Sequence, residues 1–209
     1  MSQLAAHFFT YVQGAAFYRE LHDRAVRLLP TGAGNVWFDV GCGPGLVARL
    51  AASHGYQATG FDTDTAMVRQ ARKTARSESS PTRYEAAGID ELLASGHKAN
   101  VVSAASLLAL LNDKEGALLQ LMSCLNDDGT LLVIETTDLM RPRAVWAWLK
   151  KNGYTKRKWI LLLWAWTRTH GLTVKPNDMQ LPGYRIEHAD VFEGLVSAWL
   201  VRRNARATS

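Results

Sequence analysis

Short apolar runs and longer amphipathic stretches alternate along the first two thirds of the chain. The apolar runs, bounded by turn residues, predict strands at 35–40, 57–61, 82–86, 99–104 and 130–135. Apolar residues at helical spacing predict helices within 1–30 and at 44–54, 64–77 and 114–125. This alternation indicates right-handed βαβ units and a parallel sheet with helices on both faces.

The rhythm changes after Glu135. A turn is expected at Asp127-Asp128-Gly129, just before strand 130–135. Beyond that strand, the pattern predicts two helices at 141–152 and 156–169 and two closing strands at 184–188 and 194–202. The two helices therefore form an insert between the fifth and sixth predicted strands.

Alternating glycines follow the first strand. Gly41, Gly43 and Gly45 occur in the turn Gly-Cys-Gly-Pro-Gly. Glycine allows positive φ and close backbone approach, and the N-terminus of the next helix supplies free N–H groups. Because ligands of open parallel sheets bind beyond the carboxyl ends of the strands, this turn predicts a ligand site. Leu46 stands where a dinucleotide fingerprint has Gly or Ala, which disfavours NAD and FAD, and the chain has no Gly-Lys-Ser/Thr phosphate loop.

Two acids lie at the ends of the first two strands. Asp39 precedes the glycines, and Asp62 lies 21 residues after Gly41. A carboxylate at the end of a strand can accept hydrogen bonds from both ribose hydroxyls. Asp62 could instead cap the next helix, but Asp64 is better placed for that role. We therefore expect Asp62 to bind a ribose.

Four segments carry a resemblance to a known family. VWFDVGCGPG (36–45) and TGFDTDTAMVRQAR (59–72) resemble motif I and the following acidic motif of class I S-adenosylmethionine-dependent methyltransferases. The resemblance continues through EAAGIDEL (85–92) and LLQLMSCLNDDGTLLVIET (118–136), and the style is that of small-molecule enzymes such as those of ubiquinone and menaquinone biosynthesis. It implies one α/β domain over 1–209, with a Rossmann-like, seven-stranded, mostly parallel sheet and an antiparallel last strand. A helical cap (1–30) and a helical lid (about 139–180) would complete it.

The resemblance also implies roles for individual residues. Asp39 would orient the amino-acid part of S-adenosylmethionine above the glycines, Asp62 would bind the ribose, and Thr63 and Met67 would lie beside the adenine. The end of the fourth strand, residues 103–106, would lie near the methyl group. The complete set of expected cofactor-binding residues is Tyr18, Asp39, Gly41, Cys42, Gly43, Gly45, Asp62, Thr63, Met67, Gly88, Ile89 and Ser103.

The catalytic machinery is poorly visible in the sequence. Methyl transfer from a sulfonium needs mainly positioning, and a base only when the acceptor's pKa is high. His170, His188 and Tyr11 are weak candidates for a base. Cys42 at a helix N-terminus could be acidified, but we interpret it as a small side chain in the cofactor loop. The two cysteines have no ligand spacing, so we expect no metal.

The insert concentrates charge and tryptophan. Residues 139–177 contain nine basic and no acidic side chains, whereas the remaining residues carry fifteen basic and nineteen acidic ones. Five of the seven tryptophans lie between 146 and 166. They either pack a lid on the sheet or hold an apolar acceptor whose anionic group, or a membrane surface, meets the basic rim. The expected lid residues are Trp146, Trp148, Trp164 and Trp166.

The sequence thus predicts a cytoplasmic methyltransferase that acts by direct displacement on a small, partly apolar molecule. Methylation of RNA or protein through the basic insert is the first alternative, although the fourth strand continues as SAASLL rather than as the Asn/Asp-Pro-Pro-Tyr segment of amino-methylating nucleic-acid enzymes. A protein that binds S-adenosylmethionine without catalysis is the second.

Overall fold

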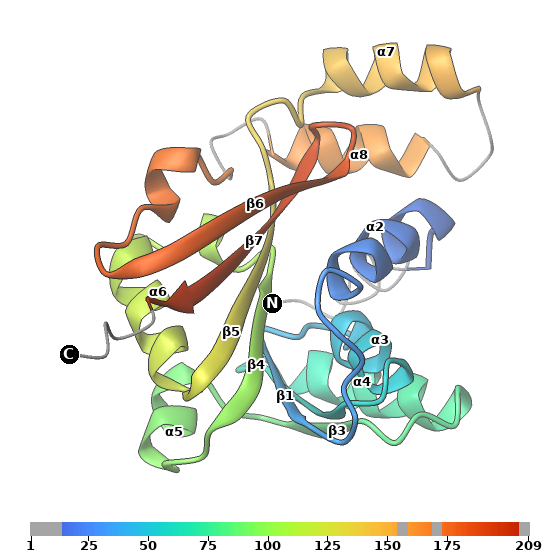
Figure 1. The fold of residues 1–209 in the computed structure, drawn as a ribbon. Coiled ribbons are helices and arrows are strands. Elements are labelled where there is room, and N and C mark those ends of the chain that lie inside the picture. The colour runs from blue at the N-terminus through green and yellow to red at the C-terminus, as the bar shows by residue number, and fades with distance from the viewer. Residues whose placement is uncertain (1–13, 154–158, 169–172, 205–209) are drawn as a thin grey trace.

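A seven-stranded sheet forms the centre of the molecule (Figure 1). The computed structural model describes residues 14–153, 159–168 and 173–204. The strands lie in the order β3-β2-β1-β4-β5-β7-β6. Only β7 runs antiparallel to its neighbours β5 and β6; the other neighbouring pairs are parallel. The strand bounds are β1 Val36–Val40, β2 Gln57–Phe61, β3 Arg83–Glu85, β4 Ala99–Ala105, β5 Leu125–Thr136, β6 Tyr184–Phe192 and β7 Val196–Arg203.

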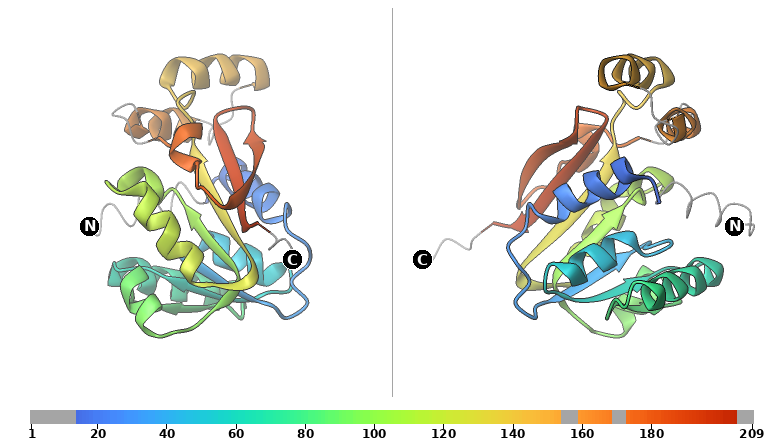
Figure 2. Two further views of the ribbon diagram at one scale, coloured as in Figure 1. Left: turned by 60° about the vertical axis from the view of Figure 1, so that its left-hand side comes forward. Right: turned by 90° about the vertical axis from the view of Figure 1, so that its right-hand side faces the viewer.

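Helices cover both faces of the sheet. The α-helix bounds are α2 Ala16–Val26, α3 Leu46–Ser53, α4 Thr65–Ser77, α5 Ile89–Ala94, α6 Lys114–Ser123, α7 Pro142–Asn152 and α8 Trp159–Arg168. Two short 3-10 helices are η1, Leu108–Leu110, and η2, Pro176–Met179. The helices α2, α3 and α4 lie on one face, and α5 and α6 lie on the other (Figures 1 and 2). The predicted fold class is confirmed.

Consecutive residues of the central strands pack into two different halves of the hydrophobic core. Trp37 and Leu132 pack in the cluster that contains α2, α3 and α4. Phe38 and Leu131, one position away, pack in the cluster that contains α5 and α6. Side chains of a strand alternate between the two faces, so a sheet covered on both sides needs almost continuous apolar strands.

Local sequence sets where several helices begin. Asp64 caps α4, because its carboxylate accepts a hydrogen bond from the Ala66 N–H at 2.8 Å. Asp113 caps α6 in the same way through the Gly116 N–H at 2.8 Å. Pro142 occupies the first turn of α7, where the missing N–H costs nothing. The assignment of the helix cap to Asp64 rather than Asp62 is confirmed.

The insert lies at the carboxyl end of β5, with α7 outermost and α8 nearer to α2 (Figures 1 and 2). Ile160, Leu161 and Trp164 of α8 are buried in the same cluster as α2. On α7, Val145 and Leu149 are buried, whereas the basic residues at its carboxyl end are exposed. The predicted insert between the fifth and sixth strands is confirmed.

One local element was not predicted, and one local prediction was wrong. Residues 89–94 form the short helix α5, which no pattern in the sequence indicated. The expected turn at Asp127–Gly129 lies inside β5, where the register against β4 shifts between the pairs Ala99/Leu125 and Val101/Thr130. The polar residues are accommodated because this part of the strand is exposed, and Asp127 forms an ion pair with Arg203 at 2.7 Å.

Among the described residues, no helix combines the length and apolar character needed to cross a bilayer.

Candidate functional site

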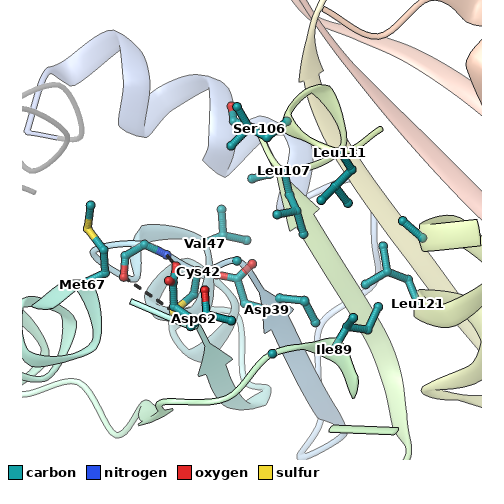
Figure 3. A pocket seen from close by; sticks show the side chains of 18 of the residues that line it. Asp39, Cys42, Val47, Asp62, Met67, Ile89, Ser106, Leu107, Leu111 and Leu121 are labelled. Atoms are coloured by element: carbon teal, nitrogen blue, oxygen red, sulfur yellow. Dashed lines mark hydrogen bonds between the residues drawn. The ribbon is translucent and has the colours of Figure 1, made fainter. Parts of the chain in front are cut away.

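A cavity of about 840 Å³ lies at the carboxyl ends of β1, β2 and β4, below α2 and α8. Asp39 and Asp62 lie on one side of it, and Leu107, Leu111 and Leu121 lie across from them (Figure 3). Ten of the twelve expected cofactor-binding residues line the cavity: Tyr18, Asp39, Gly41, Cys42, Gly43, Asp62, Thr63, Met67, Gly88 and Ile89. Their roles toward a cofactor stay predictions.

The glycine turn forms the base of the cavity. Gly41, Gly43 and Gly45 have φ of 69°, 52° and 80°, in the left-handed region that residues other than glycine rarely adopt. A Cβ at Gly45 would lie 2.4 Å from a ring carbon of Tyr84, whose hydroxyl donates to the Gly45 carbonyl at 2.9 Å. Gly45 therefore does not line the cavity but fixes the shape of the turn that does.

Asp62 ties the two strand ends together. One carboxylate oxygen accepts from the Gly43 N–H and the other from the Asp64 N–H, both at 2.8 Å. Each oxygen of an ionised carboxylate has two lone pairs, so one on each remains for a ligand. Because Asp62 also lines the cavity, it can accept two hydroxyl groups in a fixed orientation.

Asp39 is held by a buried chain of hydrogen bonds. The Trp37 indole donates to the Ser103 hydroxyl at 2.8 Å, which donates to Asp39 at 2.7 Å. Asp39 also accepts from the Ala48 N–H at 3.2 Å. Burial raises the pKa of Asp39 to about 7, although these hydrogen bonds act in the opposite direction. Ser103 itself lies within the sheet and does not line the cavity, so it supports Asp39 instead of meeting a ligand directly.

Cys42 lines the cavity as a small, mostly buried side chain. Burial raises the pKa of its thiol, and the nearby charges of Asp39 and Asp62 raise it further. The thiol is therefore protonated at neutral pH. This outcome argues against the acidified thiol that its position at a helix N-terminus allowed.

The opposite end of the cavity is lined by residues from α2, α8 and the end of β4. Tyr18 packs edge-on against Trp164, with ring centroids 5.2 Å apart, and Ser106 is its hydrogen-bonding neighbour. Arg168 lines the same end and is 6% exposed. Burial raises the pKa of Tyr18 to about 12, so its hydroxyl stays protonated and can donate. This end therefore presents hydrogen-bond donors.

His22 lines this end as a neutral imidazole. Its Nδ1 lies 2.7 Å from the Tyr18 carbonyl oxygen, which can only accept, so Nδ1 carries the proton and Nε2 keeps its lone pair. Burial lowers the pKa of His22 to about 4. The ring can thus accept a hydrogen bond, but it is a weak base.

Glu135 lies behind the wall of the cavity at the end of β5 and is fully buried. Its Oε1 accepts from the Ala109 N–H at 3.3 Å, and its Oε2 has no hydrogen-bond partner among the described residues. Burial raises the pKa of Glu135 to about 7, and the positive charge of Arg168 counteracts that rise.

The expected lid residues take different places. Trp164 lines the cavity, whereas Trp148 packs against Phe192 with ring centroids 5.1 Å apart. Trp146 and Trp166 are 46% and 63% exposed. Of the four, only Trp164 is placed to meet a ligand in this cavity.

The weak catalytic candidates gain no support. His188 lies on β6 outside the cavity lining, with its ring tilted against that of Trp199 and its Nε2 2.8 Å from the Ser197 hydroxyl. Tyr11 and His170 lie outside the described residues, as do the basic residues 156–158 of the insert.

Several residues of the site carried no recognisable signal in the sequence. Arg168, His22 and Glu135 come from three distant segments, and only packing brings them together. Leu107, Leu111 and Leu121 form the apolar wall and resemble ordinary core residues in the sequence.

A family model described as a methyltransferase domain matches residues 11–175. No curated protein matches the sequence at a significant level.

Several solved structures share the fold. The plantazolicin methyltransferase BpumL in complex with SAH (S-adenosylhomocysteine) superimposes with a TM-score of 0.65 at 12% identity, over 95% of this chain and 90% of that one. Magnesium protoporphyrin IX methyltransferase (ChlM) from Synechocystis PCC 6803, with bound SAH, gives 0.66 at 15% identity, over 96% and 95%. A TehB-like SAM-dependent methyltransferase from Corynebacterium glutamicum ATCC 13032 Kitasato gives 0.55 at 15% identity, over 88% of each chain.

Proposed function

The chain belongs to the methyltransferase-domain family, and we propose that it is a class I enzyme that transfers the methyl group of S-adenosylmethionine to a small, at least partly apolar acceptor. One observation carries the proposal: the glycine turn and Asp62 line one cavity and are joined by a hydrogen bond. The SAH named with two of the structural neighbours supports the choice of cofactor.

The cavity suits this cofactor in shape and in polar groups. Its volume of about 840 Å³ is within the range of small-molecule sites and leaves room for an acceptor beside a cofactor. The free lone pairs of Asp62 would accept the two ribose hydroxyls. Met67 and Ile89 offer apolar surface on either side for the adenine, near the backbone of Gly88. Asp39 and the backbone of Gly41 and Gly43 would face the amino-acid part.

The chemistry asks little more of the protein than orientation. S-adenosylmethionine supplies an activated methyl group, which passes to a nucleophile while the electrons of the broken bond stay on sulfur. The apolar wall excludes water, which strengthens polar contacts inside the cavity. Among the described lining residues, His22 is the neutral imidazole and can accept a hydrogen bond from the acceptor, but its low pKa makes it a poor base. Positioning at the donor end then accounts for most of the catalysis.

The position of the insert favours a small molecule as the acceptor. Trp164 and Arg168 of α8 line the cavity, so the lid (about 139–180) and the helical cap (1–30) would enclose the acceptor. The neighbours BpumL and ChlM are named as methyltransferases of plantazolicin and of magnesium protoporphyrin IX. The relation to ubiquinone-type enzymes and the cytoplasmic location stay predictions.

The outer face of the insert suggests a second contact. Trp159 and Trp166, seven residues apart and therefore on one side of α8, are 51% and 63% exposed, and Lys150 and Lys151 are exposed on α7. Such a surface could meet an anionic membrane. Sedimentation with vesicles that contain about 30% phosphatidylserine tests this contact. If binding depends on charge, it should weaken in a Lys150→Ala/Lys151→Ala variant. Equal binding to neutral vesicles, or none at all, would count against it.

One assay separates the proposal from its alternatives. The protein is incubated with S-adenosylmethionine and a cell extract, and production of SAH is measured. A small acceptor predicts activity in the fraction that passes a low-molecular-mass filter and resistance to nuclease and protease. Activity lost after nuclease or protease treatment would favour RNA or protein as acceptor. Binding of SAH without turnover in any fraction would favour a non-catalytic binding protein.

A further inference from the structure

The cavity is electrically divided. Its described acidic lining residues are Asp39, Asp62 and Asp113, which come from the ends of β1 and β2 and from the start of α6. The end formed by α2 and α8 contains Arg168 and no acid among its described lining residues. Asp39 and Asp62 suit the hydroxyls and ammonium group of the cofactor. The other end is complementary to negative charge.

Several donors converge at that end. Arg168 lines this end and carries its N–H donors in a planar fork. The Tyr18 hydroxyl stays protonated, and Ser106 is its hydrogen-bonding neighbour. All three residues line the cavity, and Trp164 beside them supplies an apolar face. A planar anion on an apolar body matches this combination of groups.

Glu135 offsets the charge of Arg168 without occupying the cavity. It is fully buried behind the wall, and its Oε2 makes no hydrogen bond to any described residue. Its effect on Arg168 is therefore mainly electrostatic. A carboxylate in the cavity could accept charge-assisted hydrogen bonds from the guanidinium, which are stronger than neutral ones.

Resting on the proposed function, we propose that the acceptor is an apolar carboxylic acid whose carboxylate is bound by Arg168 and by one hydroxyl of the hydrogen-bonded pair Tyr18 and Ser106. One cation at this end of the described lining matches a monoanion better than a phosphate dianion. The excess of basic residues in the insert would attract such an acceptor to the cavity. Arg168 is thus a specificity-determining residue.

The test uses matched probes on the protein saturated with SAH. Titration of the wild type with SAH alone comes first; no binding there is a failure of the proposed function and not of this inference. The probes are 2-naphthoate and its neutral amide, 2-naphthamide, and binding is followed by calorimetry. We expect the acid to bind about tenfold more tightly than the amide, since hydrogen bonds to charged groups are worth more than neutral ones.

Variants assign that preference to Arg168. Arg168→Gln should lose the preference for the acid while its affinity for SAH changes less than about threefold, because the cofactor uses the other end of the cavity. Arg168→Lys keeps the charge and should keep part of the preference. Arg143→Gln, an exposed arginine on α7, should behave as the wild type. Thermal unfolding by circular dichroism verifies that each variant is folded.

Three results would overturn the inference. The first is a wild-type protein that binds SAH but binds 2-naphthoate no more tightly than 2-naphthamide, or does not bind 2-naphthoate at all. The second is a preference that persists in Arg168→Gln. The third is a fall in SAH affinity of about tenfold or more in Arg168→Gln, which would mean that Arg168 serves the carboxylate of the cofactor.

Discussion

The two ends of the cavity are built in different ways. The acidic end comes from the ends of β1 and β2, where Asp39, the glycine turn and Asp62 lie within 24 consecutive residues. The donor end combines Tyr18 of α2, Ser106 after β4 and Arg168 of α8, which span 151 positions of the chain. One end is fixed by local backbone geometry, and the other depends on helices packed from distant segments.

This difference explains where stability and specificity reside. The turn at the acidic end needs three left-handed glycines and a hydrogen bond from Gly43 to Asp62, so few sequences can form it. The donor end depends instead on the packing of α2 and α8, which brings its polar residues together from distant segments with no local motif.

The largest expected effect is at the acidic end. Gly45→Ala would place a Cβ 2.4 Å from Tyr84 at a φ of 80°, so we expect a loss of about 3 kcal/mol or more in the free energy of unfolding, and loss of SAH binding. Gly96→Ala is the control, since its φ is 69° but nothing lies within 4 Å of the new Cβ. Urea denaturation should give a loss of only about 1 kcal/mol there. Similar losses in both variants would mean that contact with Tyr84 is unimportant.

A medium effect is expected behind the donor end. The folded-state pKa of Glu135 is raised to about 7 by burial, so the folded protein holds a proton that the unfolded chain has lost. The resulting stability is present at low pH and is lost as the pH rises through about 7. Relative to Glu135→Gln, the wild type should therefore be more stable at pH 5 than at pH 8 by on the order of 2 kcal/mol. Urea denaturation at both pH values measures this difference, and a constant difference would contradict the raised pKa of Glu135.

The smallest effect distinguishes the two ends by proton linkage. The pKa of Asp39 is raised to about 7 by burial, and the ammonium group of bound SAH would favour its ionised form. The affinity for SAH should therefore rise by about tenfold between pH 6 and pH 8, with proton release on binding at pH 6. Asp39→Asn should abolish this dependence, whereas Glu135→Gln should keep it. If the pH dependence disappeared only in Glu135→Gln, the titrating group would be Glu135 behind the donor end, and the role given to Asp39 would be wrong.

The features that the sequence predicts well are local ones, like those of the acidic end of the cavity. The alternation of apolar runs and helical stretches predicted the sheet, because the central strands β1, β4 and β5 are covered on both faces and are therefore almost continuously apolar. The positions of Asp62 and Asp64 in the sequence predicted which of them caps α4. Each carboxylate accepts a hydrogen bond from the backbone N–H two residues ahead, so the outcome depends on neighbouring residues alone. Such features are written within a few residues.

What the sequence could not give depends on distant contacts. Ser103 was expected beside the ligand, but its register opposite Asp39 in the sheet makes it a support for that acid. Trp146 and Trp164 are equivalent by composition, yet one is exposed and the other lines the cavity, because only α8 faces α2. The register shift in β5 arises from its pairing with β4, which a local turn pattern does not reveal.

The central claim is that the glycine turn and Asp62 form the binding site for S-adenosylmethionine. The most direct measurement is calorimetric titration with SAH of the wild type, Asp62→Ala and Asp64→Ala, with NAD as the control ligand. Asp64→Ala removes the neighbouring helix cap and should cost about 1 kcal/mol of stability without affecting binding. The account predicts micromolar SAH binding that falls by about a hundredfold or more in Asp62→Ala only, and no binding of NAD. Wild-type protein that prefers NAD, or SAH binding that survives in Asp62→Ala, would contradict it.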